Sequence, residues 1–282
     1  MGDRLQQFIL KTIGVYINAL SYLYPKEAVR LAEKYISEPR KGKLNPSDLP
    51  DILKDNRHIN LSLNGHNIQT YRWEGNEDII LLVHGWESNA ARWYKLIPIL
   101  EKSGCTIIAI DAPAHGLSGS KWFNVGKYSE FLKVAIEHFK PKYVIGHSIG
   151  GTASLFHQYK HQTPEIEKIV LLGSPGELRI MVYNFASIFN LKKRVISLME
   201  KKFFKDHQFN FETFSLVKMA PFIKSKGLIV HDRTDKIVSY REGKKLAEAW
   251  EDVTFITTRG LGHGLQDEDL YQKVYDFLFD SK

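Results

Sequence analysis

A G-x-S-x-G motif lies between Lys142 and Gly151, where the chain reads K-Y-V-I-G-H-S-I-G-G. An apolar run typical of a strand leads directly into this motif, and a helical pattern follows it. Ser148 would therefore stand at a sharp strand-to-helix turn, where its hydroxyl can attack a carbonyl carbon. Gly146 and Gly150 would remove the side chains that prevent the strand and the helix from approaching closely.

A serine hydroxyl needs a base within hydrogen-bond reach and a carboxylate that fixes the tautomer of that base. His263 follows a strand pattern and lies in a glycine-flanked loop, so we expect it to be the base. Another strand pattern, residues 228–230, is followed by two carboxylates, Asp232 and Asp235, and either could orient the histidine. Each candidate lies beyond the carboxyl end of a predicted strand, so the three groups are expected at one edge of the sheet.

Two backbone N–H groups are candidates for stabilising the negative charge that develops on an attacked carbonyl. The strand pattern at residues 79–83 ends in His-Gly, which would bring the N–H of Trp86 towards Ser148. The N–H of Ile149, at the start of the following helix, would be the second donor. Such a pair forms an oxyanion hole. An ordinary turn at the end of a strand is the alternative interpretation of the His-Gly pair.

The elements that would position these groups are short apolar runs separated mostly by helix-length segments. This alternation predicts an α/β fold with a mostly parallel sheet and helices on both faces. Asn64-Gly65, between two further strand patterns, predicts an antiparallel hairpin at the start of the sheet. Strands are expected at 59–63, 68–73, 79–83, 106–110, 143–145, 169–172, 228–230 and 253–257, and helices at 90–102, 127–139, 149–160, 241–250 and 267–279.

With these motifs in place, the chain from about Ile79 to the carboxyl terminus resembles the α/β-hydrolase fold family, serine hydrolase branch. The segment D-A-P-A-H-G-L-S-G at residues 111–119 resembles the D-x-P-G-H-G-x-S segment of many members, with Ala114 where glycine is commoner. Haloalkane dehalogenases and epoxide hydrolases have a similar pattern, but they carry aspartate at the nucleophile position. Ser148 therefore argues against those two branches.

The resemblance also implies roles for particular residues. It favours Asp235 over Asp232 as the acid, because D-x-x-V begins at Asp235. It implies that Trp86 and Ile149 supply the oxyanion donors. Asp232 and Asp111 are each expected to brace a loop by accepting hydrogen bonds from backbone N–H groups. His115, His147 and His231 are expected to shape loops rather than to act on a substrate.

Residues 1–50 are expected to form an N-terminal helical extension, and residues 51–282 the α/β-hydrolase domain. The connection at about 174–225 is too long for a simple crossover, carries two helical patterns and is rich in lysine and aromatic residues. We interpret it as a helical cap inserted at the carboxyl edge of the sheet, where ligands bind in open α/β folds. Its aromatic side chains are expected in a core more often than in a pocket.

Apolar residues recur at helical spacing near the amino terminus. Lys11 and Asn18 interrupt this segment, which makes it too polar and too short for a membrane span, and it lacks the apolar core and cleavage site of a secretory signal. We expect a helix packed on the body of a cytoplasmic protein. An interfacial helix with peripheral membrane contact, or one that docks a partner, is the alternative. The recurring residues are Leu5, Phe8, Ile9, Ile13, Tyr16, Leu20 and Leu23.

Composition excludes several other classes of protein. The net charge of +7 is too diffuse to indicate a nucleic-acid partner. The single cysteine, Cys105, rules out an intrachain disulfide framework. No cluster of His, Cys, Asp and Glu has metal-binding spacing, and no dinucleotide or phosphate-loop motif occurs. We therefore expect neither a cofactor nor a metal.

The sequence thus predicts acyl transfer to water, with a small-molecule carboxylic ester as the expected substrate. The same fold hosts several chemistries, so two alternatives stay open. One is a non-catalytic protein that binds a small ligand in the capped pocket. The other is an acyltransferase or thioesterase. Acyl chain length and oligomeric state stay open as well.

Overall fold

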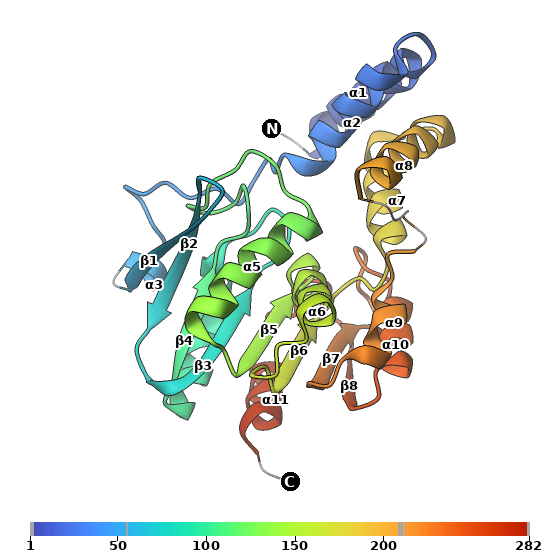
Figure 1. Ribbon diagram of the computed structural model, residues 1–282. Helices are drawn as coiled ribbons and strands as arrows, with labels where there is room; N and C mark the ends of the chain where they lie inside the picture. The colour runs from blue at the N-terminus through green and yellow to red at the C-terminus, as the bar shows by residue number, and fades with distance from the viewer. Residues whose placement is uncertain (1–2, 55, 208–210, 212, 281–282) are drawn as a thin grey trace. The chain divides into compact units, whose positions relative to one another are not determined.

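An eight-stranded sheet forms the centre of the larger part of the chain (Figure 1). The computed structural model describes residues 3–54, 56–207, 211 and 213–280. The strand order is β1-β2-β4-β3-β5-β6-β7-β8; β2 is antiparallel to both β1 and β4, and all other pairs are parallel. The expected mostly parallel sheet with an antiparallel opening pair is confirmed. The strands are β1 (Arg57–Leu63), β2 (His66–Trp73), β3 (Asn76–Val83), β4 (Cys105–Ile110), β5 (Tyr143–His147), β6 (Lys168–Leu172), β7 (Lys226–Asp232) and β8 (Val253–Thr258).

The opening hairpin follows from two residues that accept the left-handed backbone region. Asn64 has a φ of 50° and Gly65 a φ of 76°. Two successive positive φ angles are what a tight two-residue hairpin turn requires, and Asn-Gly adopts them at low cost. Leu63 consequently pairs with His66 directly across the turn.

Helices cover both faces of this sheet, as the alternating pattern predicts. In Figure 1, α5 and α6 lie on the viewer's side of the sheet and α11 lies behind it. Every second residue of the parallel strands, such as Ile80 and Leu82, joins one core cluster with side chains of α4 and α11, because strand side chains alternate between faces. The helices of this part are α3 (Asp51–Lys54), α4 (Ile97–Leu100), α5 (Val125–Phe139), α6 (Ile149–His161), α9 (Leu216–Met219), α10 (Tyr240–Ala249) and α11 (Glu268–Phe279), with 3₁₀ turn η3 (Ala220–Phe222).

One predicted helix, at 90–102, is wrong as a continuous element. The structure divides it into the 3₁₀ helix η1 (Ala90–Lys95), the short α4 and the 3₁₀ turn η2 (Glu101–Ser103). Pro98 explains the division, since proline has no N–H to donate and its ring clashes with the carbonyl four residues earlier in a continuing helix. It is tolerated here because it stands in the first turn of α4.

The chain divides into two compact units. The larger one comprises Pro39–Gly176 and Leu216–Lys282, and the smaller one comprises Met1–Glu38 and Glu177–Ser215. The smaller unit contains α1 (Asp3–Leu23), α2 (Pro25–Ser37), α7 (Leu178–Phe189) and α8 (Lys193–His207).

The smaller unit joins the amino-terminal helices to the helices of the insertion, which the sequence prediction treated as separate segments at 1–50 and 174–225. The reason is a shared apolar core that includes Ile17 of α1 together with residues of α2, α7 and α8. A Cβ on Gly14 would lie 1.5 Å from the carbonyl oxygen of Phe189, so only glycine allows this close approach. Asn18 adds hydrogen bonds to Asn190 and Lys192.

Within the described ranges, no helix is both long enough and apolar enough to cross a membrane.

Candidate active site

Ser148 lies at the turn between β5 and α6, with a φ of 52° and a ψ of −128°. A residue that carries a Cβ rarely adopts this backbone region, and such strain is common where a nucleophile is held at a sharp strand-to-helix turn. The turn is anchored by the sheet, because the Ser148 N–H donates to the carbonyl of Leu172 in β6 at 2.8 Å. The predicted position of Ser148 between a strand and a helix is confirmed.

The glycines around this turn are needed for steric reasons. A Cβ on Gly146 would lie 2.4 Å from the Cα of Gly151, and a Cβ on Gly150 would lie 2.3 Å from the carbonyl oxygen of His84. Both distances are far below van der Waals contact, and the atoms concerned belong to the backbone. The role predicted for Gly146 and Gly150, close approach of strand and helix, is therefore confirmed.

Replacing Gly150 by alanine is expected to lower the free energy of unfolding by about 3 kcal/mol, since overpacking of a buried backbone contact costs this much. Gly176 offers a matched control, because a Cβ there would find its nearest neighbour, Val217 Cγ2, at an ordinary 3.5 Å. Chemical denaturation of both variants measures the difference. Equal stability of Gly150→Ala and Gly176→Ala would contradict the steric argument.

The structure brings Ser148, His263 and Asp235 together in one hydrogen-bonded chain. His263 Nε2 lies 3.0 Å from Ser148 Oγ, and His263 Nδ1 lies 2.8 Å from Asp235 Oδ2. A carboxylate can only accept, so Nδ1 carries the proton, and the lone pair of Nε2 faces the serine hydroxyl. This is the tautomer in which an imidazole can accept a serine proton. The three side chains follow β5, β7 and β8, as predicted.

Asp235 is fully buried and is held in place by backbone donors. Its Oδ1 accepts the N–H groups of Ile237 at 2.8 Å and Val238 at 2.9 Å, which leaves Oδ2 for His263. Burial acts to raise the pKa of Asp235, but hydrogen bonds from His231, His263 and Val238 lower it further, so the pKa lies below its ordinary value. Asp235 is therefore ionised at neutral pH.

Asp232 has a different role, as the sequence predicts. It accepts hydrogen bonds from the backbone N–H of Thr234, the hydroxyl of Thr258 and the backbone N–H of Leu261, and so ties the loop after β7 to the chain after β8. These bonds lower the pKa of Asp232, against the opposing effect of burial. Its hydrogen-bonding partners in the structure do not include His263.

Asp111 also braces loops. Its carboxylate accepts the N–H groups of Ala90 and Leu117, both at 2.9 Å, and the Tyr71 hydroxyl at 2.8 Å. It thus ties the loop after β3 to the loop after β4. Burial raises the pKa of Asp111 despite these bonds.

Two other histidines near the site, His147 and His231, hold loops in place through hydrogen bonds to backbone carbonyls. His147 Nε2 donates to the carbonyl oxygen of His263 at 2.8 Å, and burial holds the pKa of His147 well below its usual value, so the ring is neutral. His231 Nε2 donates to the carbonyl of Val238 at 3.0 Å and lies 3.5 Å from Asp235 Oδ2. The expectation that these residues shape loops fits both contacts. The contact of His147 with His263 joins residues 116 positions apart, and the sequence pattern did not predict it.

Arg92 of η1 makes a second contact that the sequence did not predict. Its Nη2 donates to the carbonyl of Gly264 at 3.0 Å, and its own carbonyl accepts from Gln266 Nε2 at 3.0 Å. Burial lowers the pKa of Arg92 to about 10, so the guanidinium stays charged at neutral pH. Arg92 therefore clamps the loop that carries His263.

Replacing Arg92 by glutamine is expected to lower kcat by about 10- to 100-fold with little change in KM, because a small displacement of a catalytic group has an effect of this size. Arg92→Lys, which keeps the charge, is expected to recover part of the rate. Steady-state kinetics on an ester substrate measures both. An unchanged kcat in Arg92→Gln would show that the loop does not need the clamp.

Of the two expected oxyanion donors, Trp86 lies in the loop after β3 and Ile149 is the first residue of α6. A Cβ built on Gly85 would lie 3.0 Å from the Cβ of Ser148, so the backbone before Trp86 passes directly beside the nucleophile. In the part of the chain that the structure describes, the N–H groups of Trp86 and Ile149 donate no hydrogen bond to another protein group.

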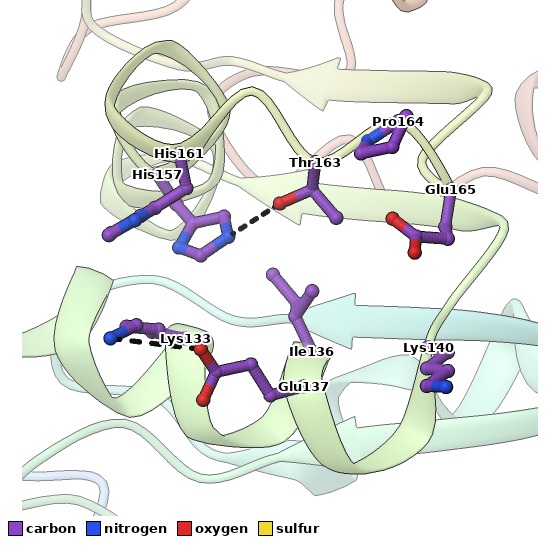
Figure 2. A pocket seen from close by; sticks show the side chains of 9 residues that line it. All are labelled: Lys133, Ile136, Glu137, Lys140, His157, His161, Thr163, Pro164 and Glu165. Carbon is purple, nitrogen blue, oxygen red and sulfur yellow. Dashed lines mark hydrogen bonds and ion pairs between the residues drawn. The ribbon is translucent and has the colours of Figure 1, made fainter.

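A cavity of about 370 Å³ lies elsewhere, between α5 and α6 (Figure 2). His157 and Thr163 line one side, with His157 Nε2 3.4 Å from Thr163 Oγ1, while Lys133 and Glu137 of α5 line the other. Burial lowers the pKa of His157 to about 4, so its ring is neutral at pH 7. This cavity does not include the serine site. Across the described ranges, no three His, Cys, Asp or Glu side chains come together in a way that could hold a metal ion.

Comparison with known proteins agrees with this architecture. The sequence profile of the alpha/beta hydrolase fold matches residues 78–192. The solved structure of a meta-cleavage product hydrolase from Pseudomonas fluorescens superimposes with a TM-score of 0.61 at 15% identity, covering 79% of this chain and 98% of that one. The chain has the α/β-hydrolase fold, and the family's sequence profile matches its central part.

Two curated relatives are similar in sequence to part of this chain. A probable serine hydrolase of Drosophila melanogaster is 28% identical over 114 residues, which cover 37% of this chain and 34% of the relative. Methylesterase 9 of Arabidopsis thaliana is 32% identical over 77 residues, which cover 25% of this chain and 30% of the relative. The chain spans less than half the length of the curated relatives it matches.

Proposed function

We propose that the protein is a serine hydrolase that cleaves a carboxylic ester or a related acyl compound through an acyl-enzyme. The observation that carries this proposal is the hydrogen-bonded chain of Ser148, His263 and Asp235, with distances of 3.0 and 2.8 Å. A binding protein has no need of a strained serine aligned with a histidine and a buried carboxylate.

In the first half of the reaction, His263 Nε2 accepts the hydroxyl proton while Ser148 Oγ forms a bond to the carbonyl carbon of the substrate. The imidazolium that results is stabilised by the ionised Asp235. The carbonyl electron pair moves onto oxygen, and the N–H groups of Trp86 and Ile149 donate to this oxyanion. When the carbonyl re-forms, the bond to the alkoxide breaks, and the alkoxide leaves with the proton from Nε2.

In the second half, water takes the place of the alcohol. His263 accepts a proton from water as the water oxygen attacks the acyl carbon, and the oxyanion again accepts from the same two N–H groups. Breaking the bond to Ser148 Oγ returns the proton to the serine and releases the carboxylic acid. The sum is one ester and one water converted into one acid and one alcohol.

The choice of an ester rests on the chemistry of the leaving group and on the relatives. An alcohol leaves more readily than an amine, because an alkoxide is a weaker base than an amide anion; His263 supplies the proton that the departing oxygen takes up. The names of the two relatives, a probable serine hydrolase and a methylesterase, also favour an ester. Acyl transfer to an alcohol, the alternative from sequence, uses the same acyl-enzyme with a different acceptor.

A series of p-nitrophenyl esters of increasing acyl length tests the proposal, with Ser148→Ala as the blank. The expected result is turnover by the wild type that exceeds the blank for at least one chain length. Turnover that is equal in the wild type and in Ser148→Ala for every ester would overturn the assignment. Faster release of p-nitrophenol on addition of an alcohol, with formation of a new ester, would instead indicate acyl transfer.

A further inference from the structure

The helix α1 exposes a continuous apolar stripe. Phe8, Val15 and Tyr22 repeat at seven-residue intervals, as do Ile9, Tyr16 and Leu23. Seven residues are close to two helical turns, so each set lies along one face. All six side chains are exposed; Phe8 is 69%, Tyr22 71% and Leu23 77% accessible. From Phe8 to Leu23 the stripe is about 22 Å long.

The fold of the smaller unit does not use this stripe. The opposite side of α1 supplies Ile13, Ile17 and Leu20 to the core shared with α2, α7 and α8. α1 is thus apolar on two faces, one packed and one open to solvent. Monomeric proteins rarely expose a contiguous apolar surface of this size unless the surface binds something.

Positive charge borders the stripe. The sequence has no acidic residue between Arg4 and Tyr24, and Lys11 lies within the helix. The guanidinium of Arg194, in the first turn of α8, lies 4.8 Å from the ring centroid of Tyr22 and donates to the carbonyl of Ser21 at 3.2 Å. Lys193 precedes it and is exposed.

Among the described residues, no carboxylate lies within ion-pair distance of the basic side chains near the stripe, Lys11, Lys192, Lys193 and Arg194. Their charge is therefore available to a negatively charged partner beside the apolar stripe.

We propose that this stripe binds the surface of an anionic lipid bilayer. The apolar side chains of α1 would enter the boundary between headgroups and acyl chains, with the helix in the plane of the membrane. Tyr22 at the carboxyl end suits the headgroup level, where tyrosine is enriched. Lys11, Lys193 and Arg194 would contact the lipid phosphates, and basic residues beside a membrane strengthen binding to anionic lipids.

Charge argues for a bilayer over a second copy of the chain. A two-fold dimer through the stripe would bring the same surface of each copy together. The cations of the two copies would then face one another, and α1 offers no carboxylate after Asp3 to pair with them. An anionic bilayer meets both the apolar and the basic side chains without this repulsion. The surface lies wholly within the smaller unit, so the inference is independent of the proposed hydrolysis.

Flotation with vesicles of phosphatidylcholine and phosphatidylglycerol in equal parts, and with vesicles of phosphatidylcholine alone, tests the proposal. The double variant Phe8→Glu/Leu23→Glu is expected to reduce binding to the anionic vesicles by roughly a hundred-fold, because burial of each apolar side chain contributes about ten-fold. The matched control is Phe222→Glu, a phenylalanine that is 60% exposed in the larger unit.

A second pair of variants tests the charges. Lys193→Glu is expected to reduce binding about five-fold or more at low salt, because one basic residue contributes about that factor at an anionic membrane. Lys121→Glu is the control, since it changes the net charge equally at an exposed position in the larger unit. Raising the salt concentration should reduce the difference between these variants.

Several outcomes would overturn the inference. The first is a wild type that binds neither kind of vesicle, and the second is equal binding by the stripe variant and its Phe222 control. The third is a wild-type dimer that Phe8→Glu/Leu23→Glu converts into monomers, without any vesicle binding, which would assign the stripe to a second copy. Each variant should unfold at the same temperature as the wild type, which would show that the substitution changes the surface and not the fold. Val15→Asn, a milder change on the same stripe, replaces any variant that fails to fold.

Discussion

Replacing His263 by alanine is expected to lower kcat for ester hydrolysis by roughly a million-fold, the effect seen when the base of a serine protease is removed. The physical reason is that Ser148 Oγ loses the base aligned with it, His263 Nε2, which lies 3.0 Å away. A neutral hydroxyl is a weak nucleophile at pH 7, and the oxyanion donors alone provide only a small residual rate.

The His263→Ala variant needs a control that separates catalysis from folding. The imidazole is 19% exposed and its loop is held through backbone carbonyls, so the fold should tolerate the loss of the ring. His138→Ala, at an exposed position on α5, should leave kcat unchanged. A loss of less than ten-fold in a correctly folded His263→Ala would mean that another group accepts the serine proton.

The second large effect is expected at Asp235. Asparagine there should lower kcat by about ten thousand-fold, because its amide cannot hold His263 in the tautomer that leaves Nε2 free to accept a proton. Asp232→Asn should keep kcat within about ten-fold of the wild type, since its hydrogen bonds go to loop residues. Steady-state kinetics at pH 7 on both variants measures this. If Asp232→Asn lowered kcat more than Asp235→Asn did, Asp232 rather than Asp235 would be the acid that orients His263.

Asp232 is expected to contribute to stability rather than to catalysis. The pKa of Asp232 is lowered in the fold, so its ionised form stabilises the native state above its unfolded pKa of about 3.9, and this contribution is lost as the pH falls through the native value. Asp232→Asn is therefore expected to lower the free energy of unfolding by about 2 kcal/mol at pH 7. The deficit should narrow as the pH falls below about 4. A deficit that is constant from pH 7 to acid pH would show that the charge of Asp232 is not the cause.

Local signals explain why the sequence predicted the sheet and the candidate site. The apolar runs of the parallel strands are short, nearly continuous and bounded by polar or glycine residues, so period and length define them without reference to the rest of the chain. Asn64-Gly65 defines its turn through backbone sterics alone. Ser148, Asp235 and His263 each follow such a run, and parallel strands necessarily bring their carboxyl ends to one edge.

What the sequence did not predict depends on contacts between distant residues. The clamp of Arg92 on Gly264 joins residues 172 positions apart, and no local pattern at either residue indicates it. The joining of α1 and α2 to α7 and α8 rests on Gly14, Ile17 and Asn18, whose partners lie in the insertion. Helical periodicity identified an apolar face on α1, but it could not say that a second apolar face stays exposed.

Intact-mass labelling with a fluorophosphonate probe tests the central claim most directly, because it reports an activated serine without any knowledge of the substrate. The wild type is expected to gain one adduct, and Ser148→Ala none. His263→Ala should label at a rate lower by several orders of magnitude, since the probe requires the same base. Absence of an adduct on the wild type, or an equal adduct on Ser148→Ala, would contradict the assignment of Ser148 as an activated nucleophile.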